Sequence, residues 1–479
     1  MPFDDLTTYY AMLYALLELC ALAAAGHAVM HARTSQGTIA WALSLIMVPF
    51  IALPAYLILS HRKLSGYVKA RRAGDVRVKD MPADLVAKYF PHIRAPLSDE
   101  MQRWRPLEHL AKMPFLRGNR VELLVDGAAT FAAVFAAVES ARDYILVQAY
   151  IVNDDQLGRD LKRRLVDKAR CGVRVFFLYD VIGSRALSAA YLADMRQAGV
   201  NVQPFSSTQK GTNRFRINFR NHRKIVVVDG REAFIGGHNV GDEYMGRHPT
   251  LSPWRDTHVK LTGPAALGVQ LTFLEDWNWA ADMVPILNTE PHIPDYDDQT
   301  VLILPTGPAD TLDTCSLFFI HAINAAQRRV WIVSPYFVPD EPVVTAMQLA
   351  ALRGVDVRIL LPARADSRLV HLAGFSYYEE IIGAGVKLYR YEQGFLHQKV
   401  MLVDDDLAAV GTANLDNRSF RLNFEITAVV ANAKFAGQVA RMLERDFAAS
   451  RRIELAELER RSLAFKVSVR TARLFSPIL

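Results

Sequence analysis

The sequence predicts an α/β protein of two similar halves behind a pair of membrane-spanning helices. Three observations support this prediction. Two apolar segments of about 20 residues open the chain, strand and helix patterns then follow twice in the same order, and one histidine–lysine–aspartate motif occurs in each half. With 479 residues, of which 51% are hydrophobic, the chain can form more than one domain.

Residues 1–60 are predicted to form a transmembrane hairpin. The first apolar segment runs from Tyr9 to Met30, interrupted by Glu18 and His27, and the second, from Thr38 to Leu59, contains no charged residue. Each has about the 20 residues that a bilayer-spanning helix needs. A cleaved signal peptide is the alternative for the first segment, but the chain starts with two aspartates instead of basic residues.

The basic residues around the hairpin predict its orientation. The connecting turn contains only Arg33, whereas seven basic residues follow the second segment: Arg62, Lys63, Lys69, Arg71, Arg72, Arg77 and Lys79. By the positive-inside rule both termini and the large C-terminal part should lie in the cytoplasm. Residues 61–117 are basic and punctuated by prolines, so we expect a connector with one or two short helices near the anionic membrane surface.

The two halves are expected at residues 118–288 and 289–479, with matching elements. In the first half we expect a helix at 128–141, a strand at 144–147, a helix at 158–171 and a strand at 172–177. The corresponding elements of the second half are expected at 312–327, 330–333, 343–353 and 354–360. Alternating helices and buried strands predict an α/β fold in each half.

The repeated motif is H-x-K-x4-D, followed after six residues by a glycine-led turn that ends in asparagine. Its members are His222, Lys224, Asp229 and Asn239 in the first copy, and His397, Lys399, Asp404 and Asn414 in the second. Histidine and lysine are two residues apart in a strand pattern, so they face the same way. Two lysines can neutralise a phosphodiester while one imidazole attacks phosphorus and the other protonates the leaving alcohol.

Four carboxylates accompany the motif, and they are predicted to differ in role. Asp229 and Asp404 lie seven residues from the histidines, about 20 Å along a strand, so a structural role is expected. Asp256 and Glu425 open the next strands and are the expected partners that orient the imidazoles. We assign Asp256 to His222 and Glu425 to His397; ordinary strand-end acids are the alternative.

Other site types have little support in the sequence. Cys20, Cys171 and Cys315 lie far apart, so they indicate neither a disulfide framework nor a zinc ribbon. A metal site at the motif is the rival interpretation, but zinc-type ligand spacing is missing there. No P-loop is present, so no nucleotide cofactor is expected, and the missing ligand spacing means that no metal is expected either. A net charge of +6 permits an anionic partner without indicating nucleic acid.

The two H-x-K-x4-D-x6-G-x-x-N copies resemble the phospholipase D superfamily over residues 121–452. This resemblance implies two halves, each a mixed sheet flanked by helices, whose motifs face each other, and a phosphohistidine intermediate without metal. The hairpin, the phrase GNRVELLVDG at 118–127 and the ending RLFSPIL at 473–479 look like the bacterial cardiolipin synthase family. That likeness implies an enzyme of the bacterial cytoplasmic membrane that joins two phosphatidylglycerols and releases glycerol, with His222 as nucleophile and His397 as acid.

Three alternatives remain open. A hydrolytic phospholipase D would use the same residues with water as acceptor. A nuclease of the superfamily would suit a basic run with interleaved aromatic residues, namely Lys210, Arg214, Phe215, Arg216, Phe219, Arg220 and Arg223. An inactive membrane scaffold should have lost part of one motif, and both copies are intact. A homo-oligomer is possible, and residues 453–469 are expected to form an amphipathic helix on the membrane or on the second half.

Overall fold

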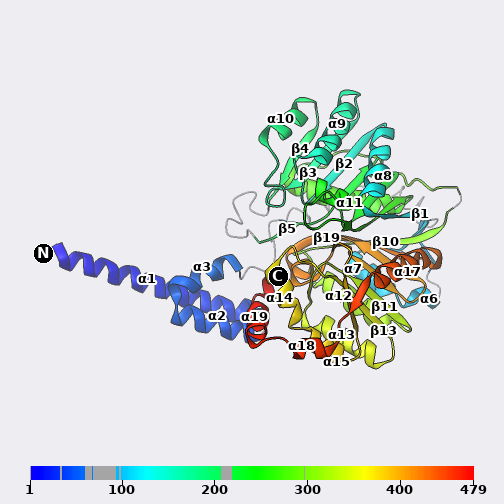
Figure 1. The fold of residues 1–479 in the computed structure, drawn as a ribbon. Coiled ribbons are helices and arrows are strands. Elements are labelled where there is room, and N and C mark those ends of the chain that lie inside the picture. Colours follow the sequence, from blue (N-terminus) through cyan, green and yellow to red (C-terminus); the bar gives the residue numbers. More distant parts are fainter. Residues whose placement is uncertain are drawn as a thin grey trace. The chain divides into compact units, whose positions relative to one another are not determined.

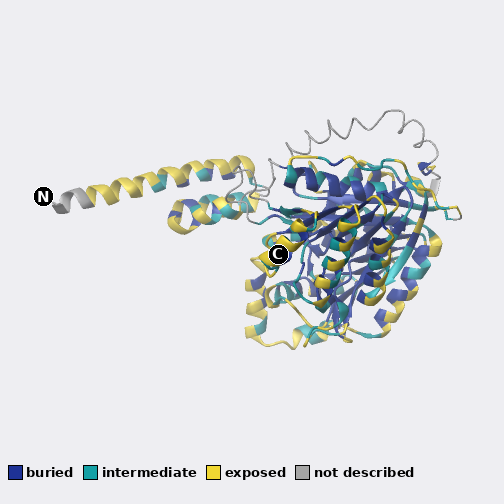
Figure 2. Ribbon diagram, turned by 90° about the horizontal axis from the view of Figure 1, so that it is seen from above, coloured by how far each residue is buried: buried dark blue, intermediate teal, exposed yellow. Residues whose placement is uncertain are grey.

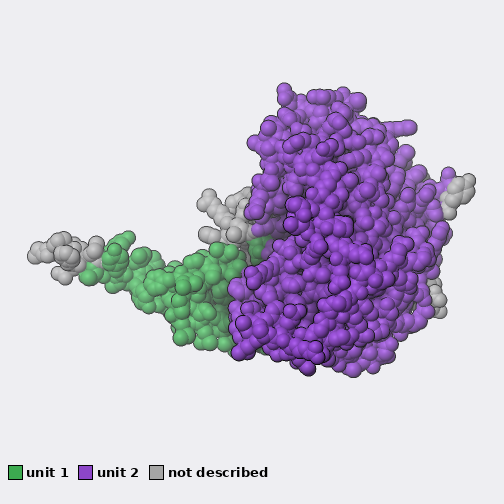
Figure 3. All heavy atoms as spheres, viewed as in Figure 1, with its two compact units in different colours: residues 1–66, 207–219 green, residues 67–206, 220–479 purple. Residues whose placement is uncertain are grey.

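The computed structural model describes residues 2–32, 35–59, 67, 93–96, 99–206, 218–295 and 297–479. The chain divides into two compact units (Figure 3): an N-terminal unit of residues 1–66 and 207–219, and a larger unit of residues 67–206 and 220–479. Most of the expected connector, with its cluster of basic residues from Arg62 to Lys79, lies outside the described residues.

The described residues of the N-terminal unit form one long helix and two short ones. Helix α1 (Pro2–His31) has 30 residues, and its segment Thr7–His31 is the one helix among the described residues long and apolar enough to cross a membrane. The expected second span is divided into α2 (Ser35–Met47) and α3 (Pro49–Leu59), of 13 and 11 residues. At about 1.5 Å per residue each is shorter than the hydrocarbon core, so the two-helix hairpin is not confirmed.

Proline explains the break between α2 and α3. Pro49 has no N–H to continue the hydrogen bonds of α2, and it takes the first position of α3, where proline is favoured. Within this unit Ala25 and Ala28 of α1 pack with Leu45, Ala52 and Tyr56. The small alanine side chains allow the helices to approach closely.

The larger unit is built on one mixed sheet with an internal repeat. The strands of the first half follow the order β1 (Leu116–Val125), β9 (Thr257–Thr262), β7 (Glu232–Gly236), β6 (Ile225–Val228), β2 (Tyr144–Ala149), β3 (Arg174–Asp180) and β4 (Asn201–Phe205). The second half repeats this order with β10 (Gln299–Thr306), β19 (Asn423–Ala431), β17 (Leu407–Gly411), β16 (Val400–Val403), β11 (Arg329–Val333), β13 (Asp356–Pro362) and β14 (Lys387–Tyr391), and ends at β20 (Ser450–Arg452). Strands β1 and β10 pair antiparallel and join the halves into one sheet.

Helices flank this sheet in both halves (Figure 1). The first half has α8 (Asp126–Ser140), α9 (Gln156–Arg170), α10 (Ala189–Gln197) and α11 (Ala265–Ala281). The second half has α12 (Thr314–Ala325), α13 (Glu341–Leu352), α14 (Arg368–Phe375), α15 (Tyr378–Gly383), α16 (Asn417–Arg421) and α17 (Ala433–Ala448). The short helices α6 (Asp99–Gln102) and α7 (Arg105–Ala111) precede the sheet, and α18 (Leu455–Glu459) and α19 (Leu463–Arg473) follow it.

Buried residues lie mainly along the strands, and exposed ones on the outer helices (Figure 2). The eight elements expected from the sequence all occur, as α8, β2, α9 and β3 and as α12, β11, α13 and β13. The predicted α/β fold with a mixed sheet flanked by helices is therefore confirmed. The C-terminal segment expected as one helix is instead divided into α18 and α19 by residues 460–462.

Very short strands near the motifs complete the structure. Strand β5 (Arg220–Asn221) pairs parallel with β19, β15 (Phe395–Leu396) pairs parallel with β8 (Trp254–Arg255), and β12 (Phe337–Val338) pairs parallel with β18 (Leu415–Asp416). The first two pairs link the halves, because one strand of each comes from before residue 288 and the other from after it.

Candidate active site

Strands β5 and β15 place the two motif histidines beside the opposite half of the chain. In the register of β5, Asn221 lies opposite Phe424, so His222 follows next to Glu425. In the register of β15, Leu396 lies opposite Arg255, so His397 follows next to Asp256. The backbone N–H groups of the histidines continue these ladders, from His222 to Phe424 O at 3.0 Å and from His397 to Arg255 O at 2.8 Å.

His222 is held by Glu425. Its Nδ1 lies 3.0 and 2.9 Å from the two oxygens of the carboxylate. Glu425 is fully buried and also accepts hydrogen bonds from the hydroxyls of Thr412 at 2.6 Å and Ser419 at 2.8 Å. These donors fix the carboxylate, which in turn fixes the orientation of the imidazole.

His397 is held by Asp256 in the same way. Its Nδ1 lies 2.7 Å from Asp256 Oδ2, and the other oxygen accepts the backbone N–H of Thr257 at 2.8 Å. Gly237 leaves the space for this carboxylate, because a Cβ at that position would lie 1.9 Å from Asp256 Oδ1. Thr412 takes the matching position in the second half, where its hydroxyl contacts Glu425.

The expected pairing of carboxylates and histidines within each half is wrong: the pairs are crossed. Asp256 orients His397 and Glu425 orients His222. The physical reason is the pairing of β5 and β15 with strands of the other half. A two-residue strand has no periodicity, so the sequence holds no signal for this pairing.

Both imidazoles are neutral in this site at pH 7. Burial lowers the pKa of His222 to about 4, although the Glu425 carboxylate opposes the shift. Burial and the Lys399 charge lower the pKa of His397 to about 3, against the effect of Asp256. Since each Nδ1 faces a carboxylate, Nδ1 carries the proton and each Nε2 has a free lone pair.

The carboxylates remain ionised despite their burial. Burial alone would raise the pKa of Glu425, but His222, Lys224 and Thr412 outweigh it and lower that pKa. The pKa of Asp256 is likewise lowered, because the histidines His238 and His397 outweigh the cost of burial. Each imidazole thus has a negatively charged partner that can stabilise its protonated form.

The two lysines are buried beside the histidines. Lys224 Nζ donates to His222 O at 2.6 Å, and Lys399 Nζ donates to His397 O at 2.5 Å. Burial lowers the pKa of Lys399 to about 8, against nearby carboxylates that raise it. Burial and repulsion from Lys399 lower the pKa of Lys224 well below its ordinary value. A bound phosphate would supply the negative charge that favours both ammonium groups.

Asp229 and Asp404 lie at the far ends of the motif strands, where they hold turns. The first accepts hydrogen bonds at 2.8–2.9 Å from the backbone N–H groups of Arg142, Asp143 and Tyr144, and the second at 2.8–3.2 Å from those of Gln327, Arg328 and Arg329. Both aspartates have positive φ, 53° and 51°. These contacts fix the start of β2 and β11 and support the structural role expected for the motif aspartates.

The motif asparagines differ between the halves. Asn239 accepts the N–H of Ile151 at 3.2 Å and donates to Tyr244 Oη at 2.8 Å. The backbone N–H of Asn414 donates to Ser419 Oγ at 3.0 Å, while its buried Oδ1 has no hydrogen-bond partner among the described residues. Asn239 therefore fixes the loop after β2, and Asn414 fixes the helix that carries Ser419.

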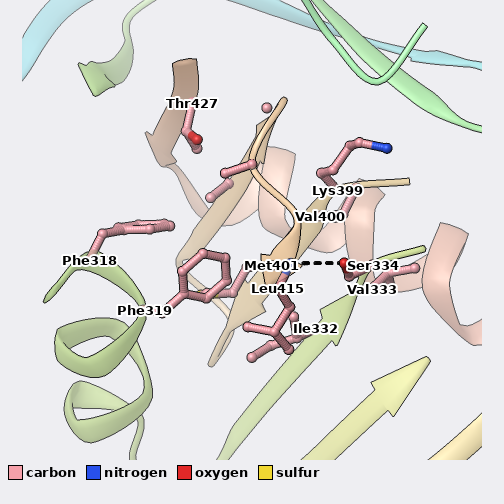
Figure 4. A pocket seen from close by; sticks show the side chains of 13 residues that line it. Phe318, Phe319, Ile332, Val333, Ser334, Lys399, Val400, Met401, Leu415 and Thr427 are labelled. Carbon is pink, nitrogen blue, oxygen red and sulfur yellow. Dashed lines mark hydrogen bonds between the residues drawn. The ribbon is translucent and has the colours of Figure 1, made fainter. Parts of the chain in front are cut away.

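A further difference between the halves was missed in the sequence. In the first half the Nδ1 atoms of His238 and His258 lie 3.1 Å apart; the matching residues of the second half are Ala413 and Thr427. Beside Ala413 and Thr427 the structure has a cavity of about 20 Å³, whose lining also includes Lys399 and Ser334 (Figure 4). This volume holds about one water molecule. A residue-by-residue alignment of the two repeats would have revealed the two histidines.

Aromatic rings surround both motif histidines. The Tyr150 ring lies edge-on to His222 with a centroid distance of 4.9 Å, and the rings of Trp254 and Phe395 lie 5.2 and 5.9 Å from that of His397. Among the residues that the structure describes, no group of three or more His, Cys, Asp or Glu side chains is arranged to hold a metal ion.

A repeated α/β sheet with two histidine–lysine pairs and crossed orienting carboxylates defines a phospholipase D-type enzyme. The family model described as "Cardiolipin synthase, PLD-like domain" matches residues 134–248 and 319–447. This chain belongs to the cardiolipin synthase family.

Similar proteins cover nearly the whole chain. Cardiolipin synthase A of Pseudomonas putida (strain GB-1) is 49% identical over 478 residues, which are 98% of each chain. Cardiolipin synthase A of Pseudomonas aeruginosa (strain LESB58) is 50% identical over 481 residues, 99% of this chain and 97% of that one. The crystal structure of phosphatidylserine synthase from Haemophilus influenzae Rd KW20, at 14% identity, covers 79% of this chain and 100% of that one with a TM-score of 0.59, which shows a shared fold.

Proposed function

We propose that this protein is a cardiolipin synthase, which transfers the phosphatidyl group of one phosphatidylglycerol to the glycerol hydroxyl of another and releases glycerol. The observation that carries the proposal is the pair of carboxylate-oriented imidazoles, each with a lysine two residues away. The relatives named cardiolipin synthase A, at about half identity over the full length, support the same activity. The enzyme is associated with the membrane, in keeping with the apolar helix α1.

In the first step the Nε2 lone pair of His222 attacks phosphorus, and the bond from phosphorus to the glycerol oxygen breaks. His397, protonated on Nε2, gives its proton to that oxygen, so free glycerol leaves. The negative charge of the bound phosphodiester raises the pKa of the imidazoles, and Asp256 stabilises the imidazolium of His397. The product is a phosphatidyl group bound to His222.

In the second step a hydroxyl of another phosphatidylglycerol takes the place of glycerol. His397, now neutral, accepts the hydroxyl proton, the oxygen attacks phosphorus, and the bond from phosphorus to His222 breaks. One phosphodiester replaces another, so the exchange needs no nucleotide. Lys224 and Lys399 neutralise the phosphate oxygens while charge builds up on them.

The alternatives have less support. A hydrolytic phospholipase D is not favoured by the relatives, which are named as synthases over nearly their full length. For a nuclease, the proposed basic run should be accessible, but the Arg223 guanidinium is buried and paired with Asp276 at 2.8 Å. Lys210, Arg214, Phe215 and Arg216 lie outside the described residues.

We further propose the domain organisation expected from the sequence: a membrane region at 1–60, a connector at 61–117 and two phospholipase D-like domains at 118–288 and 289–479. The charge asymmetry around the N-terminal segments supports a multi-pass arrangement with the enzyme domains in the cytoplasm. Cysteine labelling from either side of sealed vesicles would test it, since both termini should be labelled only from the cytoplasmic side.

The activity is tested with purified protein and phosphatidylglycerol as the only lipid in detergent. Cardiolipin with an equal amount of free glycerol is the expected product. Phosphatidic acid with glycerol would show that water is the acceptor and would overturn the synthase proposal.

A further inference from the structure

Helix α19 (Leu463–Arg473) has one face that packs on the larger unit. It lies along α14 (Figure 1), where the ring of Phe465 meets that of Phe375 at a centroid distance of 5.1 Å. Ala472 belongs to the main hydrophobic core of the second half. The helix is therefore anchored by Phe465 and Ala472, seven residues apart on one side.

The opposite face of α19 is apolar and exposed. Leu463 and Val467 are 78% and 57% exposed, and Leu474, directly after the helix, is 78% exposed. At 100° per residue, positions 463, 467 and 474 fall on one stripe, and Arg470 lies at its edge. Phe475, which follows Leu474 in the chain, is also exposed. A stripe of large apolar side chains in water is unfavourable unless something covers it.

The charged side chains of the segment that carries this stripe are all of one sign. Residues 460–479 contain five basic residues and no Asp or Glu: Arg460, Arg461, Lys466, Arg470 and Arg473. Lys466 and Arg470 are exposed on α19 beside the apolar stripe. An apolar face edged by cations complements a surface that offers both acyl chains and anionic headgroups.

We propose that the outer face of α19, made of Leu463, Val467, Leu474 and Phe475 with Lys466 and Arg470, binds the surface of an anionic lipid bilayer. The apolar side chains enter the boundary between headgroups and acyl chains, and the two cations contact lipid phosphates. This contact goes beyond the proposed reaction, because none of these residues takes part in the chemistry. It would hold the larger unit against the surface in which phosphatidylglycerol is dissolved.

The first test locates the face directly in the full-length protein. A fluorophore is attached at Val467→Cys or Leu474→Cys in a Cys20→Ser/Cys171→Ser background, since Cys315 is buried. Leu352→Cys, on a residue of α13 that is 75% exposed, is the control. The protein is reconstituted in vesicles of phosphatidylglycerol and phosphatidylcholine, or of phosphatidylcholine alone.

The proposal predicts that nitroxide-labelled lipids quench the fluorophore at 467 and 474 but not at 352, and more strongly in the anionic vesicles. Equal quenching by aqueous iodide at all three positions would overturn it. Protection at 467 and 474 that rises with protein concentration in detergent without lipid would assign the face to a second copy of the chain instead.

The second test separates membrane contact from catalysis. Leu463→Asp/Leu474→Asp should raise the apparent KM for phosphatidylglycerol in vesicles about tenfold, because two leucines that the bilayer would cover are lost. The same variant should leave turnover in detergent micelles unchanged. Leu312→Asp/Leu352→Asp, on leucines exposed elsewhere, should change neither. Equal loss of activity in vesicles and micelles would contradict the proposal. The quenching result stands whether or not cardiolipin is the product, so it is independent of the proposed function.

Discussion

At the scale of single residues, the crossed contacts make each motif histidine depend on the other half of the chain. His222 lies in the first repeat, but the carboxylate that orients it comes from the second, and His397 has the reverse arrangement. Neither repeat therefore contains a complete imidazole–carboxylate pair. The two copies of the motif together form a site that neither copy can form alone.

The motif residues should be indispensable one by one. His222→Ala and His397→Ala are each expected to lower turnover by about 10³-fold or more, because nucleophile and acid act in the same step. Lys224→Ala and Lys399→Ala should lose nearly as much, since each removes a charge that neutralises phosphate. Steady-state release of glycerol is the measurement, with the exposed His109→Ala as control. Substantial activity in either histidine variant would refute the two-histidine mechanism.

The crossed pairing changes which carboxylate serves the leaving group. If His397 is the acid, Asp256→Asn should slow glycerol release but be rescued by a phosphatidyl substrate whose leaving alcohol has a low pKa, because that alcohol needs no proton. Glu425→Gln, which disorients the nucleophile, should slow both substrates alike. Single-turnover measurements of the release of each leaving group distinguish the two variants. Rescue of Glu425→Gln instead would make His397 the nucleophile.

The pKa of Lys399 predicts the alkaline limit of activity. Because that pKa is lowered to about 8, mainly by burial, the lysine is charged below this pH and neutral above it. We expect kcat/KM, which reports the free enzyme, to fall as the pH rises through about 8. Asp366 is among the carboxylates that raise this pKa, so Asp366→Asn should move the fall to lower pH. Asp194→Asn, an exposed carboxylate on α10, should leave the profile unchanged.

At the scale of elements, the long patterns were predictable and the short contacts were not. Strands β2, β3, β11 and β13 are buried runs, so composition alone located them within a few residues. Strands β5 and β15 have two residues each and pair with partners far away in the sequence, so only the folded chain reveals them. The site's residue types followed from the motif, whereas their pairing depended on these two short strands.

A proline and a helix-capping serine account for the remaining differences between the helices expected from the sequence and those observed. Apolar composition predicted the length of the second N-terminal segment, but Pro49 divides it into α2 and α3. The C-terminal segment has apolar residues at helical spacing throughout, yet Ser462 caps a new helix by accepting the N–H of Phe465 at 3.3 Å. Spacing of apolar residues predicts a helical face and does not show where one helix ends and the next begins.

The glycine-led turn of the first motif should tolerate no side chain. In Gly237→Ala the new Cβ would overlap Asp256 Oδ1, at 1.9 Å, so the carboxylate must move away from His397. We expect activity to fall about 10²-fold, as for loss of an orienting partner. Gly383→Ala, where a Cβ meets no atom within 4 Å, is the control. Full activity in Gly237→Ala would show that the turn can shift without disturbing the histidine.

At the scale of the whole molecule, the two repeats are joined in one continuous sheet. Strands β1 and β10 pair at the seam, and the helices that follow β9 and β19 reach across it, α11 to β10 and α17 to β1. This arrangement places both histidine–carboxylate pairs inside a single chain. A second copy of the chain is not needed to complete the site.

Mixing of inactive variants tests this conclusion. A chain with His222→Ala keeps an intact His397–Asp256 pair, and a chain with His397→Ala keeps an intact His222–Glu425 pair. Because both histidines must act on one phosphorus, an equimolar mixture, co-expressed so that mixed oligomers can form, should stay as inactive as each variant alone. The measurement is cardiolipin formed per chain, beside a mixture of wild type with His222→Ala as a control for dilution. Recovery of about a quarter or more of wild-type activity would show that the site is formed between two copies of the chain, as expected when a shared site takes one intact half from each partner.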